Sequence, residues 1–267
     1  MLRKFNTNRK PSDNLKLGGL TAFVAGMVNV ASLMIFFAFT SNVTGHFAIL
    51  AEEISKGNWY QAGIVFGWIF CFFVGNFISG FIIVHWGQAR RSFAHAVPLI
   101  LEIIIFVSVG SYGLLYYKET LKETEIMVGV MLLSMGLQNG LTAAISNFSI
   151  KTTHLTGLTT DVGILSAMFT RKYYREKEEL RQKFQLLLVI VTCYLCGGIL
   201  AGAVYLQLQF EVFFFVAGVL LFIIIYDFIK LKKQAARRQL SIETKREAMH
   251  RLLRIKENRR QRQRKSR

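Results

Sequence analysis

Six long runs that are nearly free of charge limit this chain to a membrane-spanning helical fold. Each run is close to or above the roughly 18–20 residues that a helix needs to cross a hydrocarbon core of about 30 Å. With 52% hydrophobic residues, a soluble chain would scatter them, but here they are gathered into runs. The runs are Leu17–Thr40, Trp59–Val84, Ala96–Tyr117, Ile126–Phe148, Phe184–Leu206 and Val212–Ile229. The sequence therefore predicts an all-α membrane protein with six transmembrane helices.

Basic residues are concentrated in alternate connections between these runs. Of the 33 Lys and Arg, 30 lie in residues 1–16, in the loops 86–95 and 149–183, or from Lys230 onward. The opposite connections hold only Lys56, Lys118 and Lys122. Because cytoplasmic loops carry the excess of Lys and Arg, both termini are predicted to be cytoplasmic.

A series of short motifs occurs twice in the same order. The matched positions are Gly26 and Asn29 with Gly136 and Asn139, Thr44-Gly45 with Thr156-Gly157, and Cys71, Gly75 and Gly80 with Cys193, Gly197 and Gly202. Each copy contains three runs, so the second copy would lie inverted relative to the first. The alternative is that the glycines serve only helix packing. The expected organisation is a basic N-terminus (1–16), two three-span repeats (17–117 and 118–230) and a basic tail (231–267).

Each copy also contains a short segment with a polar start and an apolar end. These segments are 41-SNVTGHFAILAEEIS-55 and 151-KTTHLTGLTTDVGILSAMF-169. From Thr44 and from Thr156 they would form helices of about 16–21 Å, roughly half a bilayer. We expect Thr44 and Thr156 to be N-caps, and Gly45 and Gly157 to let a backbone or a ligand approach. The alternative is a pair of interfacial helices on opposite membrane surfaces.

Two half-helix N-termini that face each other would form a polar site for a small solute near the membrane midplane. The expected substrate-binding residues are Thr44, Gly45, Gln138, Asn139, Thr156 and Gly157. Ionisable groups at membrane depth are costly and usually face a cavity. Proton or cation coupling is therefore assigned to Asp161, Glu102, His46 and His154. The alternatives are a solvated carboxylate for Asp161, a structural or interfacial position for Glu102 and ordinary turn polarity for the histidines.

Enzyme chemistry has little support in the sequence. It contains no His-x3-His pair, no Gly-x-Ser-x-Gly motif and no Gly-x4-Gly-Lys phosphate loop. Cys193-x-x-Cys196 lies within an apolar run without further ligands in its neighbourhood, which favours packing over metal binding. We therefore expect no catalytic residue, no metal and no cofactor.

The motifs resemble the DUF1275 (YoaK) family of bacterial inner-membrane proteins. The resemblance rests on 26-GMVN-29, 42-NVTGH-46, 136-GLQNG-140 and 152-TTHLTG-157, and it covers most of residues 17–230. Asn29 stands where this family frequently has an acidic residue, and His46 where it often has Asn. The resemblance implies a six-helix protein of the bacterial cytoplasmic membrane and assigns no biochemical activity.

Two functions are compatible with the sequence. The first is a secondary transporter of a small solute, since inverted halves supply two nearly equivalent conformations that open to opposite sides. The second is a non-transporting membrane scaffold or assembly factor. In both, the lipid bilayer is a partner, and assembly into a homo-oligomer stays open.

The basic tail is expected to bind anionic lipid in preference to nucleic acid. Sixteen basic residues follow from Lys230, and Ile242, Met249, Leu252 and Leu253 have the spacing of a short amphipathic helix, with disorder expected after about Asn258. Each basic residue near an anionic surface contributes about 1 kcal/mol.

We predict that truncation after Gln234 strongly weakens binding of the purified protein to anionic liposomes. The reason is that the truncation removes most of the tail's positive charge. Co-sedimentation with anionic and with neutral liposomes measures this effect. Unchanged binding to anionic liposomes would show that the tail does not recognise the membrane surface.

Overall fold

The computed structural model describes residues 11–86, 91–146 and 150–229. All regular elements within these ranges are helices. The chain forms two compact units, Met1–Ile224 and Ile225–Arg267, and only the first is described over most of its length. The predicted basic segment before Pro11 and the tail from Lys230 onward lie outside the described residues.

The helices follow the apolar runs, with two short helices inserted between them. Their bounds are α1 Pro11–Phe36, α2 Val43–Ser55, α3 Trp59–Trp86, α4 Arg91–Leu115, α5 Leu121–Ser146, α6 Leu155–Met168, α7 Lys172–Arg175, α8 Glu178–Leu208 and the 3-10 turn η2 Gln209–Glu211. A further helical segment covers residues 212–229. Between α8 and this segment the chain turns at Gln209, whose φ is +45°.

Five described helical stretches are long and apolar enough to cross a membrane. They are Asn14–Phe36, Trp59–Trp86, Ala94–Leu115, Leu121–Ser146 and the 52-residue stretch Glu178–Ile229, which includes the turn at Gln209. With 13 and 14 residues, α2 and α6 are too short to cross. The chain is therefore a multi-pass, all-helical membrane protein.

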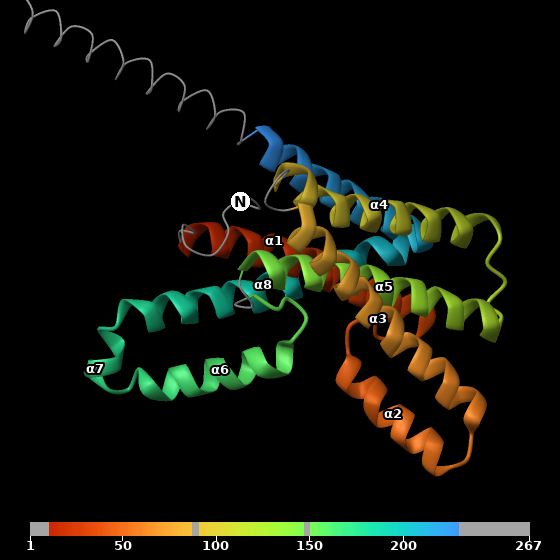
Figure 1. Cartoon of the computed structure of the whole chain (residues 1–267), viewed down its shortest axis with the longest axis horizontal. Helices are drawn as coiled ribbons and strands as arrows, with labels where there is room; N and C mark the ends of the chain where they lie inside the picture. Colours follow the sequence, from red (N-terminus) through yellow and green to blue (C-terminus); the bar gives the residue numbers. More distant parts are fainter. Residues whose placement is uncertain (1–10, 87–90, 147–149, 230–267) are drawn as a thin grey trace, which may run out of the picture. The chain divides into compact units, whose positions relative to one another are not determined.

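Two helix pairs form the middle of the first unit. The most extensive packing joins α1 to α8 and α3 to α5, and α1 also contacts α5. Figure 1 shows α2 and α6 on one side of these helices and α4 on the other. Each pair combines one helix from the first copy of the motifs with one helix from the second copy. The first copy supplies α1 and α3, and the second copy supplies α8 and α5.

Within each pair, the two backbones touch at a glycine. A Cβ on Gly26 would collide with the carbonyl oxygen of Tyr194, and a Cβ on Gly197 with that of Phe23. This crossing holds α1 against α8. Small residues permit such close approach in membranes, where no hydrophobic effect drives one apolar helix against another.

The α3–α5 pair is joined in the same way at the matched positions of the repeat. A Cβ on Gly136 would collide with the carbonyl oxygen of Phe72, and a Cβ on Gly75 with that of Leu133. Four of the repeated glycines thus serve packing at equivalent places in both pairs, whereas a Cβ on Gly80 meets nothing within 4 Å.

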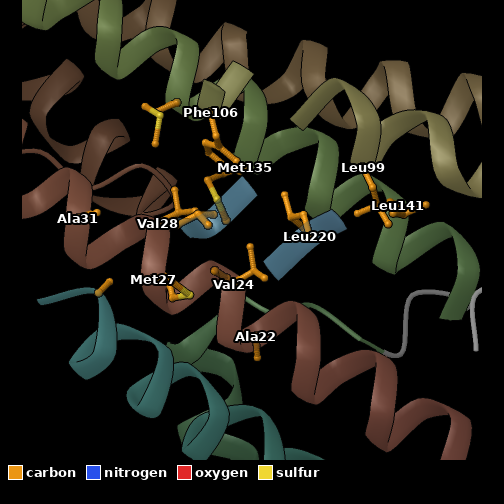
Figure 2. Close-up of a cluster of buried hydrophobic side chains, with 14 of the residues drawn as sticks. Ala22, Val24, Met27, Val28, Ala31, Leu99, Phe106, Met135, Leu141 and Leu220 are labelled. Atoms are coloured by element: carbon orange, nitrogen blue, oxygen red, sulfur yellow. The ribbon is translucent and has the colours of Figure 1, made fainter. Parts of the chain in front are cut away.

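An apolar core lies where α4 and the segment 212–224 cover the middle helices. Figure 2 shows Val28 of α1, Phe106 of α4 and Met135 of α5 close together, with Leu220 nearby. The ring of Phe213 stacks against both Phe106 and Phe36, with ring centroids 6.3 Å apart in each case. The part of the core under α4 lies on the opposite side of the middle helices from α2 and α6.

We predict that Gly75→Ala destabilises the protein by about 1–3 kcal/mol, because the added methyl group overlaps a backbone that cannot rotate away. Gly63→Ala is the matched control on α3, since a Cβ there meets nothing within 4 Å. It should be neutral or slightly stabilising, because alanine favours helix by about 0.5–1 kcal/mol over glycine. Thermal unfolding in detergent compares the variants. Equal stability of the Gly75→Ala and Gly63→Ala variants would show that the glycine crossing does not determine the stability of the fold.

Candidate functional site

An open cavity of about 450 Å³ lies at the N-terminal ends of α2 and α6. Its walls also include residues of α1, α3, α5 and α8, so both middle pairs contribute to it. Figure 1 shows α2 and α6 running from this region toward opposite ends of the bundle. The volume falls within the range of about 300–1,000 Å³ that is typical of sites for small ligands.

Most of the cavity wall consists of matched positions from the two copies. The matched lining residues are Asn29 and Asn139, Phe39 and Lys151, Ser41 and Thr153, Asn42 and His154, Val43 and Leu155, Thr44 and Thr156, and Phe72 and Tyr194. Asn76 and Ala143 complete the lining. The cavity is therefore quasi-symmetric, with polar side chains contributed by both copies.

Asn29 and Asn139 anchor the chain at the start of the short helices. Asn29 Nδ2 donates to the carbonyl of Ala25 at 2.9 Å, and its Oδ1 accepts from the Ser41 hydroxyl at 2.9 Å. It also accepts from the Thr40 hydroxyl at 3.4 Å. Each bond to Oδ1 ties α1 to the segment that leads into α2.

The second copy repeats this arrangement. Asn139 Nδ2 donates to the Met135 carbonyl at 3.0 Å and to the Thr153 hydroxyl at 2.9 Å, and its Oδ1 accepts from Thr152 at 3.4 Å. Both asparagines are buried. Each therefore links a long helix of one middle pair to the short helix that packs on the other pair, since α2 packs on α3 and α6 on α8.

The prediction that Thr44 and Thr156 are N-caps is wrong. The caps are two residues earlier, at Asn42 and His154, because both helices begin one residue before the threonines. The Asn42 side chain accepts from the Gly45 backbone N–H at 3.2 Å, which is the usual role of a capping asparagine. The His154 side chain makes no capping bond. The first turn of α6 thus keeps more of its N–H groups available than that of α2.

The cavity has a positive electrostatic character. Lys151 is the charged side chain among its lining residues, and the lining includes no Asp or Glu. The N-terminus of a helix adds the equivalent of about half a positive charge, and two such ends are at the cavity. This arrangement suits an anionic group or the carboxylate of a zwitterion.

Four of the residues predicted from sequence line the cavity, namely Thr44, Asn139, Thr156 and His154. Gly45 and Gly157 lie in the first turns of the short helices but do not line it. A Cβ on Gly157 would collide with the His154 ring, and one on Gly45 would come within 2.7 Å of Asn42 Nδ2. These glycines therefore make room for the capping residues.

The other predicted residues lie away from the cavity wall. Asp161 forms an ion pair with Lys183 Nζ at 2.9 Å and is partly exposed. Gln138 and Glu102 are fully buried. Glu102 is therefore not exposed on the surface of the helix bundle.

His46 is buried on the side of α2 that packs on α3. Its ring lies 5.5 Å from that of Trp68, and its Nε2 is 2.9 Å from the Phe39 carbonyl. Burial lowers the pKa of His46, and the bond to the Phe39 carbonyl opposes this only in part. Because a carbonyl oxygen only accepts, Nε2–H donates to it.

Sequence reasoning did not select several lining residues. The missed ones are Ser41, Asn42, Phe72, Asn76, Lys151, Thr153 and Tyr194. Extending the repeat would have found most of them, because Thr40-Ser41 falls on Thr152-Thr153, and Phe72 and Tyr194 each follow a matched cysteine. Within the described ranges, no group of three or more His, Cys, Asp or Glu could hold a metal ion.

Comparison with known protein families identifies a match. The family model described as "Protein of unknown function (DUF1275)" matches residues 17–226. No curated protein and no solved structure matches the chain.

We predict that Asn139→Ala loosens residues 150–156 while residues 40–45 stay protected. Losing buried hydrogen bonds of this kind costs about 1–3 kcal/mol, which corresponds to about tenfold or more faster amide exchange. Asn29→Ala should produce the reverse pattern and is the matched control. Hydrogen–deuterium exchange with mass spectrometry measures both. Equal changes in the two segments would contradict separate anchoring by the two asparagines.

Proposed function

The chain belongs to the DUF1275 family, and we propose that it is a secondary transporter that moves a small anionic or zwitterionic solute through the cavity between α2 and α6. The observation that carries this proposal is the quasi-symmetric polar lining, with its positive character and ligand-sized volume. A scaffold or assembly factor requires no such cavity. A catalytic role would require acid, base or nucleophile groups, which this lining does not bring together.

The proposed mechanism uses the two middle pairs as moving bodies. The glycine crossings hold α1 to α8 and α3 to α5 at backbone contact, so each pair moves as one piece. The short helix α6 moves with the α1–α8 pair and α2 with the α3–α5 pair, because each packs on a helix of that pair. Rocking one body against the other opens the cavity to alternate sides, as inverted repeats allow.

A solute in the cavity would contact both moving bodies. Asn29, Tyr194 and Thr156 belong to one body, and Asn139, Phe72 and Thr44 belong to the other. Binding therefore stabilises conformations in which both walls close on the solute. A ligand shifts a conformational equilibrium only if it binds one conformation more tightly than the other. Contacts to both bodies supply this difference in affinity, because they form together only when both walls close.

The membrane arrangement in this proposal has six spans. The stretch Glu178–Ile229 supplies two of them, separated by the turn at Gln209. The repeats are inverted, and α2 and α6 are half-helices whose N-termini meet inside the bilayer. The protein resides in the bacterial cytoplasmic membrane with both termini in the cytoplasm, as the distribution of Lys and Arg favours.

We predict that Lys151→Met weakens solute binding by about tenfold or more, since a hydrogen bond to a charged group contributes about 1.5–3 kcal/mol. Small carboxylates and amino acids are first screened by thermal shift of the purified protein, and a stabilising compound is then tested for uptake into proteoliposomes. Lys172→Met is the matched control. Lys172 does not line the cavity, and its Nζ lies 3.8 Å from Glu176 on the surface.

Wild type and Lys172→Met should bind and take up the compound equally, and Lys151→Met should do so poorly. Equal binding and uptake by all three proteins would place the site elsewhere. A compound that binds in the cavity but is never taken up would favour the scaffold.

A further inference from the structure

A second polar site lies on α5, in addition to the solute cavity. Glu102 of α4 and Gln138 of α5 are both fully buried. Within the part of the chain that the structure describes, both carboxylate oxygens of Glu102 and both polar atoms of the Gln138 side chain are without a hydrogen-bond partner. Each buried group of this kind costs about 1–3 kcal/mol when it stays unpaired. The cost of leaving these atoms unpaired favours a ligand that supplies a missing hydrogen bond between them.

Neighbouring side chains place Glu102 and Gln138 opposite each other. The pairs that Figure 2 shows close together are Phe106 with Met135 and Leu99 with Leu141, all members of one buried cluster. On α4, Glu102 is three residues after Leu99 and four before Phe106. On α5, Gln138 is three residues after Met135 and three before Leu141. Since residues three or four apart share a helix face, Glu102 and Gln138 lie at one level on the facing surfaces of α4 and α5.

The surroundings of Glu102 contain no described cation that pairs with it. The charged and titratable groups on the elements that pack around α4 include Arg91, His95 and Tyr112 on α4 itself, Tyr60, Cys71 and His85 on α3, Lys122, Glu123 and Glu125 in the first turns of α5, and Glu211 in η2. Arg91 is 11 residues from Glu102 and Lys122 is 16 residues from Gln138, about 16 Å and about 24 Å along their helices. His95 is seven residues from Glu102, about 10 Å along the helix. An ionised Glu102 would therefore be an uncompensated charge in an apolar core, which is among the most costly arrangements in a membrane protein.

We propose that Glu102 binds a proton and that the Gln138 side-chain oxygen accepts the resulting O–H. Binding one proton converts the carboxylate into a neutral acid with one donor, and an amide offers the matching acceptor. On release, the proton passes to water and leaves the carboxylate ionised. A hard metal ion is a poor occupant, because such ions take about six oxygen ligands and these two side chains offer only three oxygens.

The position of Gln138 next to Asn139 connects this proton site to the solute cavity. Asn139 lines the cavity and bonds Thr153, while Gln138 is fully buried and does not line the cavity. Adjacent residues on a helix point about 100° apart. At this level, α5 therefore presents Gln138 to the proton site and Asn139 to the solute cavity. A proton on Glu102 would fix α5 against α4 and thereby favour one position of the α3–α5 pair. This coupling rests on the proposed transport function, whereas the proton site itself does not.

Dicyclohexylcarbodiimide, which modifies protonated carboxyls in apolar surroundings, tests the proton site on the full-length protein in lipid nanodiscs without solute. Glu125 is the internal control, because it is also buried in α5 but accepts a hydrogen bond from the Tyr60 hydroxyl at 2.8 Å. Mass spectrometry should show Glu102 labelled about tenfold or more above Glu125, since each pKa unit changes the ratio of protonated to ionised carboxyl by about that factor. Equal labelling, or no labelling of Glu102, would overturn the proposal.

Infrared spectroscopy gives a second readout. Wild type should show the carbonyl band of a protonated carboxyl, and Glu102→Gln, which preserves the shape of the neutral acid, should lose it. Gln138→Leu should keep the band and shift it to higher frequency, because the acid then lacks its hydrogen-bond partner. A band that persists unchanged in Glu102→Gln would overturn the assignment.

Together with uptake, these measurements separate the two proposals. Labelled Glu102 without uptake of any screened compound would leave the proton site standing and count against transport. Uptake by a protein whose Glu102 is unlabelled would support transport and overturn the proton site.

Discussion

Direct backbone contact at two glycine crossings is the constraint on which the other features of this fold depend. At Gly26 with Gly197, and at Gly75 with Gly136, a methyl group would already collide with a facing carbonyl. The crossings bring α1 onto α8 and α3 onto α5, so each middle pair combines the two copies of the motifs. Asn29 and Asn139, three residues beyond the crossings on α1 and α5, then come to line one cavity. The cavity therefore depends on close packing at glycines that do not line it.

The two copies differ in charge and in helix capping at matched positions of the cavity wall. In α2, the cap is Asn42, which occupies the Gly45 N–H, and Phe39 lines the wall. In α6, the matched positions are His154, which does not cap, and Lys151. An anionic group would therefore bind nearer to α6, while α2 supplies a similar shape with less charge. If the proposed transport takes place, this asymmetry makes the two ends of its path chemically different.

Much of this architecture could be predicted from sequence, because lipid requires long apolar helices and the repeat marks equivalent places. The short helices were predicted to start at Thr44 and Thr156, one residue after their observed starts at Val43 and Leu155. Side-chain direction was harder to predict. Gln138 and Asn139 are adjacent, yet only Asn139 lines the cavity. Which of the two faces the cavity depends on how α5 is rotated relative to its neighbours, and that rotation is set by tertiary packing. Asp161 likewise could be assigned to the surface only once Lys183 of α8 was known to lie beside it.

The central claim is that two mixed bodies move against each other around the cavity. Electron–electron distance measurements between spin labels on exposed residues test it most directly. One label pair, Ile54 of α2 and Ile164 of α6, reports on the distance between the two bodies. The control pair, Ile164 and Leu188 of α8, lies within one body. The account predicts two distance populations for the first pair, in a ratio that changes with pH, and one narrow population for the second. A single unchanging distance for both pairs would contradict it.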